Sequence, residues 1–147
     1  MTFTIRKVLD DKLRQDGSVA EVMLGDHRET FPLITTLWTV QDYQRQWCGA
    51  IKAMVKHKVA ACMLVTDIQP RQNSSGITYW ALFREGEQIY VQERLMRYAP
   101  AAELLVIPVE AEKIIPPRIQ GTGEEHENVS EWLVSMSDLA EFLRVGC

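Results

Sequence analysis

One segment constrains the fold of this chain more than any other, because its apolar residues recur at helical spacing. From residue 40 to residue 55 they fall mostly three or four positions apart, and polar side chains occupy the other faces. The apolar positions are Val40, Tyr43, Trp47, Ile51, Met54 and Val55. Thr39 precedes this pattern and Asp42 follows three residues later, a variant of the capping box. The pattern therefore predicts an amphipathic helix at residues 40–58.

The segments on either side of this helix favour antiparallel strands. Residues 19–33 place Gly25 and Asp26 between two β-prone stretches, which predicts a hairpin. The strands expected after the helix are residues 59–68, 77–84 and 87–92, with two further strands at 104–109 and 130–134. Residues 77–84 are apolar on both faces, as in a central strand, and Gly86 suits a tight hairpin turn.

The C-terminal segment predicts a second, shorter helix at residues 137–146. Ser137 is the expected N-cap, acidic residues occupy the first turn, and Gly146 follows the last periodic position. A chain of 147 residues supports one domain that buries its own core, so we expect a single domain over residues 1–147. The fold class expected is α+β.

Cysteine usage and the apolar runs indicate where the protein resides. Cys48, Cys62 and Cys147 show no CxxC spacing, and reduced, buried thiols are favoured over a disulfide framework. The N-terminus carries charges within a few residues and lacks the apolar region of a signal peptide. No apolar run approaches the roughly 20 residues of a membrane-spanning helix. A cytoplasmic location is therefore expected, with no membrane partner.

The sequence contains no recognisable catalytic or metal-binding motif. Its histidines are His27, His57 and His126, and none has the spacing of a zinc ligand pair. Gly-rich phosphate loops, nucleophile elbows and dinucleotide fingerprints are also missing from the sequence. We therefore expect no enzymatic activity, no metal and no cofactor. A small hydrolase that uses one of the three histidines stays open as an alternative.

Charge is distributed unevenly along the chain. Sixteen Lys and Arg residues stand against twenty Asp and Glu residues, a formal net charge of −4. Residues 40–58 have a local net charge of +3, whereas residues 110–127 have −3. Such an acidic segment is either a solvated loop or a surface that docks a cationic partner.

The four tryptophans admit two interpretations. Trp38, Trp47, Trp80 and Trp132 lie on or beside expected regular elements, where such side chains usually supply core area. Alternatively, exposed aromatic side chains near Arg84, Arg94 and Arg97 would stack bases, as in single-strand nucleic-acid-binding modules. The overall acidity makes nucleic acid the less favoured partner.

The order of several landmarks resembles a known family. The landmarks are Trp38, Asp42-Tyr43, Trp47, Trp80, Tyr90-Val91-Gln92 and Ser130-Glu131-Trp132. In this order, over roughly residues 19–143, the chain resembles the CdiI immunity proteins of contact-dependent growth-inhibition systems. The resemblance points to the branch whose partners include toxin domains that cleave ribosomal RNA. It implies strongly bent antiparallel sheets, similar to the Whirly fold, and carries over no catalytic residue.

The resemblance also implies a partner, the C-terminal toxin domain of an exported CdiA-type protein, which this chain would neutralise by stoichiometric binding. Nuclease domains tend to be basic, so a complementary acidic surface would speed encounter and fix orientation. We expect the toxin to bind acidic side chains in loops or turns, namely Glu110, Glu112, Glu124, Glu125 and Glu127, with Glu85 and Glu87 as secondary candidates. The basic helix at residues 40–58 is the alternative docking face.

Overall fold

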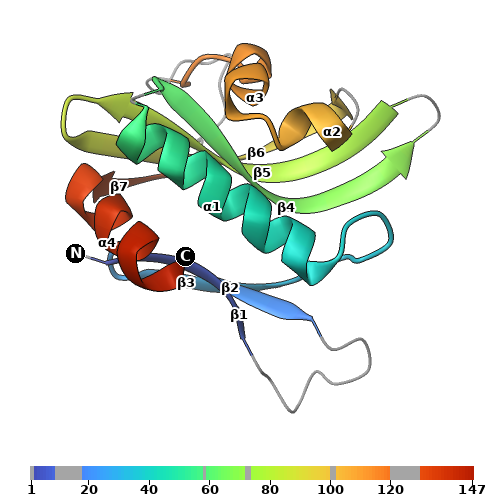
Figure 1. The fold of residues 1–147 in the computed structure, drawn as a ribbon, viewed down its shortest axis with the longest axis horizontal. Helices are drawn as coiled ribbons and strands as arrows, with labels where there is room; N and C mark the ends of the chain where they lie inside the picture. Colours follow the sequence, from blue (N-terminus) through green and yellow to red (C-terminus); the bar gives the residue numbers. More distant parts are fainter. Residues whose placement is uncertain (1, 9–17, 58, 72–73, 100–101, 120–129) are drawn as a thin grey trace.

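In a computed structural model, the described part of the chain combines two antiparallel sheets with four helices (Figure 1). The structure describes residues 2–8, 18–57, 59–71, 74–99, 102–119 and 130–147. The strands are β1 (Phe3–Val8), β2 (Val19–Leu24), β3 (His27–Pro32), β4 (Ala61–Arg71), β5 (Ser74–Glu85), β6 (Gln88–Ala99) and β7 (Glu131–Ser135). The helices are α1 (Val40–Lys56), α2 (Ala102–Leu105), α3 (Pro108–Ile114) and α4 (Met136–Gly146). The α+β class is confirmed.

The smaller sheet has the order β1-β2-β3 and contains the predicted hairpin. Gly25 begins the turn with a φ of 63°, a left-handed conformation that favours glycine. Ala20, Val22 and Leu24 of β2 are buried and belong to the core. The first strand, β1, was not predicted from the sequence, although its Phe3 and Ile5 are almost fully buried.

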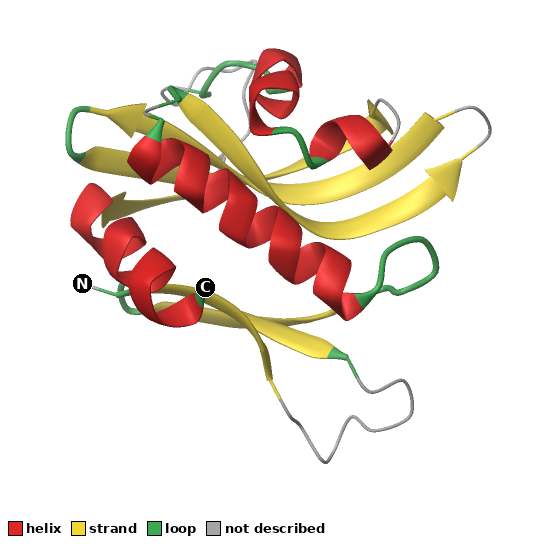
Figure 2. Ribbon diagram, viewed as in Figure 1, coloured by secondary structure: helices red, strands yellow, loops and turns green. Residues whose placement is uncertain are grey.

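The larger sheet has the order β4-β5-β6-β7 and bends strongly (Figure 2). Its register shifts between Val65 and Asp67 on β4 and between Ser75 and Ile77 on β5, and such irregularities bend a strand locally. On β5, residues Tyr79, Trp80, Ala81 and Leu82 are all buried, so both faces of this internal strand are covered, as predicted.

Helix α1 lies along the free edge of β4 and satisfies the backbone groups there. Gln46 Nε2 donates to the carbonyl of Met63 at 2.7 Å, and the N–H of Val65 donates to Gln46 Oε1 at 2.8 Å. Trp47 Nε1 donates to the carbonyl of Val65 at 2.6 Å. Unpaired edge groups attract other strands, so this helix both completes the core and covers an edge open to aggregation.

The predicted helix boundaries are close to those observed, with one change of cap. The Thr39–Asp42 capping box of α1 is present, and the helix ends at Lys56, two residues before the predicted end. At the C-terminus, the predicted N-cap was wrong. Ser135 caps α4, not Ser137, because the N–H of Asp138 donates to Ser135 Oγ while the Asp138 carboxylate accepts from the N–H of Ser135.

The strand predicted at residues 104–109 was also wrong, because this segment forms α2 and the start of α3. Pro108 lacks the N–H that a strand ladder requires, and it occupies the first turn of α3, where no intrahelical donor is needed. Leu105 is buried, whereas its apolar neighbours in the run face outward. An apolar run of this length does not by itself distinguish a strand from a helix.

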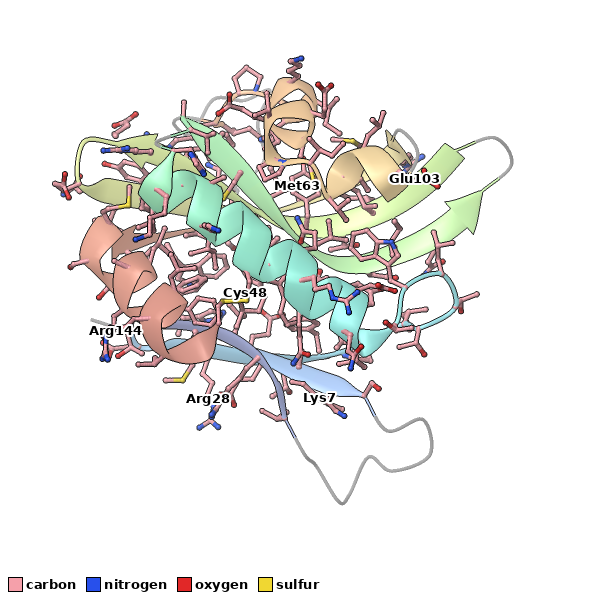
Figure 3. All side chains as sticks on the ribbon, viewed as in Figure 1. Lys7, Arg28, Cys48, Met63, Glu103 and Arg144 are labelled. Atoms are coloured by element: carbon pink, nitrogen blue, oxygen red, sulfur yellow. A yellow bond between two sulfur atoms is a disulfide. The ribbon has the colours of Figure 1, made fainter. Side chains whose placement is uncertain are left out.

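The cysteines differ from the prediction as well. Cys48 on α1 and Cys147 after α4 form a disulfide, with Cα atoms 5.9 Å apart (Figure 3). The predicted reduced state was therefore wrong for these two residues, because the packing of α4 against α1 joins positions 99 apart in the sequence. Cys62 is a free, buried thiol, as predicted.

Candidate functional site

The described acidic residues predicted to bind a partner come from two elements of the fold, the β5–β6 connection and helix α3. Glu85 ends β5 and Glu87 lies in the turn before β6, where both are exposed. Glu110 and Glu112 lie on α3, so the expectation that they occupy loops was wrong. The remaining candidates, Glu124, Glu125 and Glu127, lie outside the described residues.

The Glu112 carboxylate joins helix α3 to the start of strand β4. Its Oε2 accepts hydrogen bonds from the backbone N–H groups of Ala60 and Ala61, at 2.8 and 3.2 Å. These donors lie at the start of β4, so the carboxylate fastens α3 to the edge strand. A carboxylate engaged by two backbone donors is less available to a partner, and Glu112 is thus a weaker candidate for docking than its neighbour Glu110.

Glu85 belongs to an ion-pair network. Arg118 donates from Nε and from its terminal nitrogen to the two oxygens of Glu131, each at 2.8 Å, and contacts Glu85 at 3.3 Å. The guanidinium lies 3.6 Å above the ring of Tyr90. The hydrogen bond from Arg118 lowers the pKa of Glu131. The network partly neutralises Glu85, and Glu110 pairs with Lys113 at 3.2 Å, which leaves Glu87 as the most available of the described candidates.

The α2–α3 segment carries a feature that the sequence did not identify as a site, an exposed cluster of aliphatic side chains. Its members are Leu104, Val106, Ile107 and Val109, which are between 41% and 57% exposed. We call these four residues the α2–α3 apolar surface. Glu103 and Glu110 lie within the same segment, which gives the surface acidic neighbours. The apolar run 104–109 was the sequence signal, but its prediction as a strand concealed the exposure.

A second acidic feature lies between the two sheets. A groove of about 240 Å³ is lined by Glu29 of β3, Asp67 of β4 and Glu93 of β6, with Phe31 and Trp80 among its apolar walls. The pKa of Glu93 is raised, first by burial and second by the Glu29 carboxylate. Sequence reasoning did not bring these carboxylates together, because their proximity depends on how the two sheets pack.

Cations gather on a different part of the molecule. Lys52 and Lys56 of α1 and Arg144 of α4 line a groove of about 680 Å³ beside the disulfide. The basic face predicted for the helix therefore persists in the fold. It lies along the α1–α4 junction, whereas the α2–α3 apolar surface has acidic neighbours.

The tryptophans favour the core interpretation. Trp38, Trp47 and Trp80 are between 1% and 7% exposed, so their faces are not available to stack on bases. Trp132 is partly buried and stacks on His27, with ring centroids 4.5 Å apart. These four residues do not provide the exposed aromatic platform that the nucleic-acid alternative requires.

The histidines show no sign of an assembled catalytic site in the described part of the chain. His27 contacts Glu29 at 3.4 Å, and His57 is the C-cap of α1. His126 lies outside the described residues. Where the chain is described, no three His, Cys, Asp or Glu side chains gather as a metal-binding group. No helix among the described residues is long and apolar enough to cross a membrane.

Comparison with known proteins identifies the family. The family described as the CdiI N-terminal domain matches residues 33–142. The immunity protein CdiI of Enterobacter cloacae subsp. cloacae is 22% identical over 123 residues, covering 84% of this chain and 82% of that protein. A chain in the CdiA-CT/CdiI toxin and immunity complex from Enterobacter cloacae has the same fold, with a TM-score of 0.70, 20% identity and 97% of each chain covered. Since the family match spans well over half of its length, the chain belongs to the CdiI N-terminal domain family.

Proposed function

We propose that this protein is an immunity protein that binds the C-terminal toxin domain of a cognate CdiA-type exported protein and neutralises it by forming a stoichiometric complex. Membership of the CdiI N-terminal domain family carries this proposal. Its support is the likeness, over 97% of each chain, to a structure of a toxin and immunity complex. Inhibition by binding needs no catalytic residues in the inhibitor, and no assembled active site is found in the described part of the chain.

The toxin in this proposal is a nuclease of the class that cleaves ribosomal RNA, encountered in the cytoplasm. The support is electrostatic. The chain has a formal net charge of −4, and a domain that grips RNA phosphates usually carries a basic surplus. Complementary charge accelerates association and disfavours wrong partners.

The docking residues proposed are the available acidic side chains, which would pair with the Lys and Arg residues that a nuclease presents to RNA. They are Glu87 in the described structure, Glu124, Glu125 and Glu127 in the acidic C-terminal segment, and Glu85, Glu110 and Glu112 as residues already engaged within the fold. Charge-assisted pairs between carboxylates and guanidinium groups give orientation as well as attraction.

The test uses the exported-protein gene expected beside this one. Its C-terminal domain is purified, and its cleavage of ribosomes is measured with and without this protein. We expect inhibition to be complete at a 1:1 ratio and a calorimetric stoichiometry of about one. Cleavage that continues at a molar excess of this protein would refute the proposal.

One charge-reversed variant tests the proposed charges. Reversing Glu124, Glu125 and Glu127 to Lys should slow association by about tenfold or more at low salt, and the difference should shrink as salt screens the attraction beyond about 10 Å at 0.1 M. Tight, strongly salt-dependent binding of single-stranded RNA or DNA by the protein alone would instead support the nucleic-acid alternative.

A further inference from the structure

The α2–α3 apolar surface is too exposed to serve the core. Leu104, Val106, Ile107 and Val109 are between 41% and 57% exposed, while the core contacts of this segment come from Leu105 and Ala111. The four residues lie within six consecutive positions of the chain. Apolar side chains that are scattered singly over a surface need no explanation, but four exposed aliphatic residues within positions 104–109 point to an interaction site.

Ile107 gives a second and independent observation. It is the N-cap of α3 and makes no side-chain cap hydrogen bond. Ser, Thr, Asp and Asn are preferred at this position, because their side chains accept a hydrogen bond from the first turn. The other two N-caps described, Thr39 of α1 and Ser135 of α4, both form capping boxes. The Ile107 side chain therefore does not cap the helix, and it is 44% exposed.

The surface is also held firmly in place. Glu112 on α3 accepts hydrogen bonds from the N–H groups of Ala60 and Ala61 at the start of β4, and Leu105, the last residue of α2, is 1% exposed. A surface fixed on its inner side loses little conformational freedom when its outer side is covered, which favours tight binding.

The charges around the surface favour one kind of occupant. Glu110 pairs with Lys113 at 3.2 Å, and Glu103 makes no ion pair with a described residue. A symmetric contact with a second copy would bring both copies of Glu103 into one interface, on a chain that is already acidic overall. A cationic partner avoids both the repulsion between two copies of Glu103 and the repulsion between two acidic chains.

We propose that the α2–α3 apolar surface is the anchor for the toxin domain, receiving apolar side chains of a basic partner while Glu103 pairs with a cation at the rim. This inference rests on the proposed function and deepens it. Rim charges contribute little to affinity by themselves, so a tight inhibitor needs a central apolar contact that excludes water. The surface provides one outside the acidic residues predicted from the sequence.

Ile107→Ser tests the anchor without harming the fold. Serine supplies the missing cap, so the thermal midpoint of the free protein should be unchanged or higher. Binding to the purified toxin domain should weaken by about tenfold, because an aliphatic contact is lost. The double variant Ile107→Ser with Val109→Ser should weaken binding by about a hundredfold. Val145→Ser, at a 64% exposed position on α4, is the matched control and should bind as the wild type does.

The outcomes separate this inference from the proposed function. Wild-type affinity in the double variant would overturn the anchor and leave the proposed function intact. Equal weakening by Val145→Ser would also overturn the anchor. A wild-type dimer that the double variant converts to monomer, as seen by analytical ultracentrifugation, would assign the surface to a second copy. Failure of the wild type to bind the toxin domain would overturn the proposed function, and the anchor with it.

Discussion

Replacing Gln46 with methionine should destabilise the protein far more than the same substitution at an exposed position of helix α1. Gln46 is 4% exposed and uses both ends of its amide, donating to the carbonyl of Met63 at 2.7 Å and accepting from the N–H of Val65 at 2.8 Å. Methionine has a similar length and preserves helix propensity, but it offers neither group. The variant leaves a carbonyl and an N–H of the β4 edge unpaired beneath the helix.

The magnitude follows from those two orphaned groups. A buried backbone donor or acceptor that loses its partner costs about 1–3 kcal/mol. Two such groups, partly offset by the more favourable burial of methionine, give a loss of about 2–4 kcal/mol in the free energy of unfolding. For a domain of this size, each kcal/mol lowers the midpoint by about 2–4 °C, so the expected fall is about 5–15 °C.

Circular dichroism during heating and urea titration measures this effect. The matched control is Gln44→Met, the same chemical change at an exposed position of the same helix. We expect the control to change stability by no more than about 0.5 kcal/mol, as is usual for surface substitutions. If Gln46→Met were no more destabilising than Gln44→Met, the amide would not be satisfying the β4 edge, and our account of how α1 packs would be refuted.

Three further predictions concern the cysteines and one ion pair. Cys48→Ser should lower stability under oxidising conditions by about 3–5 kcal/mol in urea titrations, because the bond to Cys147 closes a 99-residue separation, and dithiothreitol should produce the same loss in the wild type. Burial raises the pKa of the Cys62 thiol, so mass spectrometry should detect its alkylation at pH 8 after unfolding but not before. The pKa of Glu131 is lowered, chiefly by Arg118, so its stabilisation is complete above the unfolded pKa of about 4.3 and is lost as pH falls through the folded value. Arg118→Gln should therefore destabilise more at pH 7 than at pH 3 in urea titrations.

Local sequence signals predicted the elements whose structure is determined locally. Helix α1 was predicted to within two residues, because Thr39 and Asp42 define its start and its apolar stripe must face the core. The turns at Gly25 and Gly86 both have a φ of 63°, a conformation that glycine adopts at no steric cost. These features depend on neighbours within a few positions and can be recognised without the rest of the fold.

Features that depend on distant neighbours were missed. Residues 104–109 are apolar enough for a strand, yet Leu105 is the buried member of the run, a distinction that only the packing of α2 and α3 reveals. The Cys48–Cys147 bond depends on α4 lying against α1. Glu112 was expected to be free for a partner, but its carboxylate binds the N–H of Ala60, 52 positions away. Composition indicated the acidity of this region and could not indicate which carboxylates were already engaged.

If the α2–α3 apolar surface binds the toxin domain as proposed, the division of roles among the helices lets that surface vary while the fold is kept. The polar atoms of Gln46 and Trp47 on α1 hydrogen-bond to the edge of β4. Substitution of either residue therefore destabilises the core. The exposed side chains of α2 and α3 are not needed to hold that segment in place. Its contacts with the rest of the fold come from the buried Leu105 and Ala111 and from the hydrogen bonds of Glu112. A surface supported in this way can vary in shape and charge at little cost to stability. A protein that must fit one partner and reject similar ones requires this separation of binding surface from core.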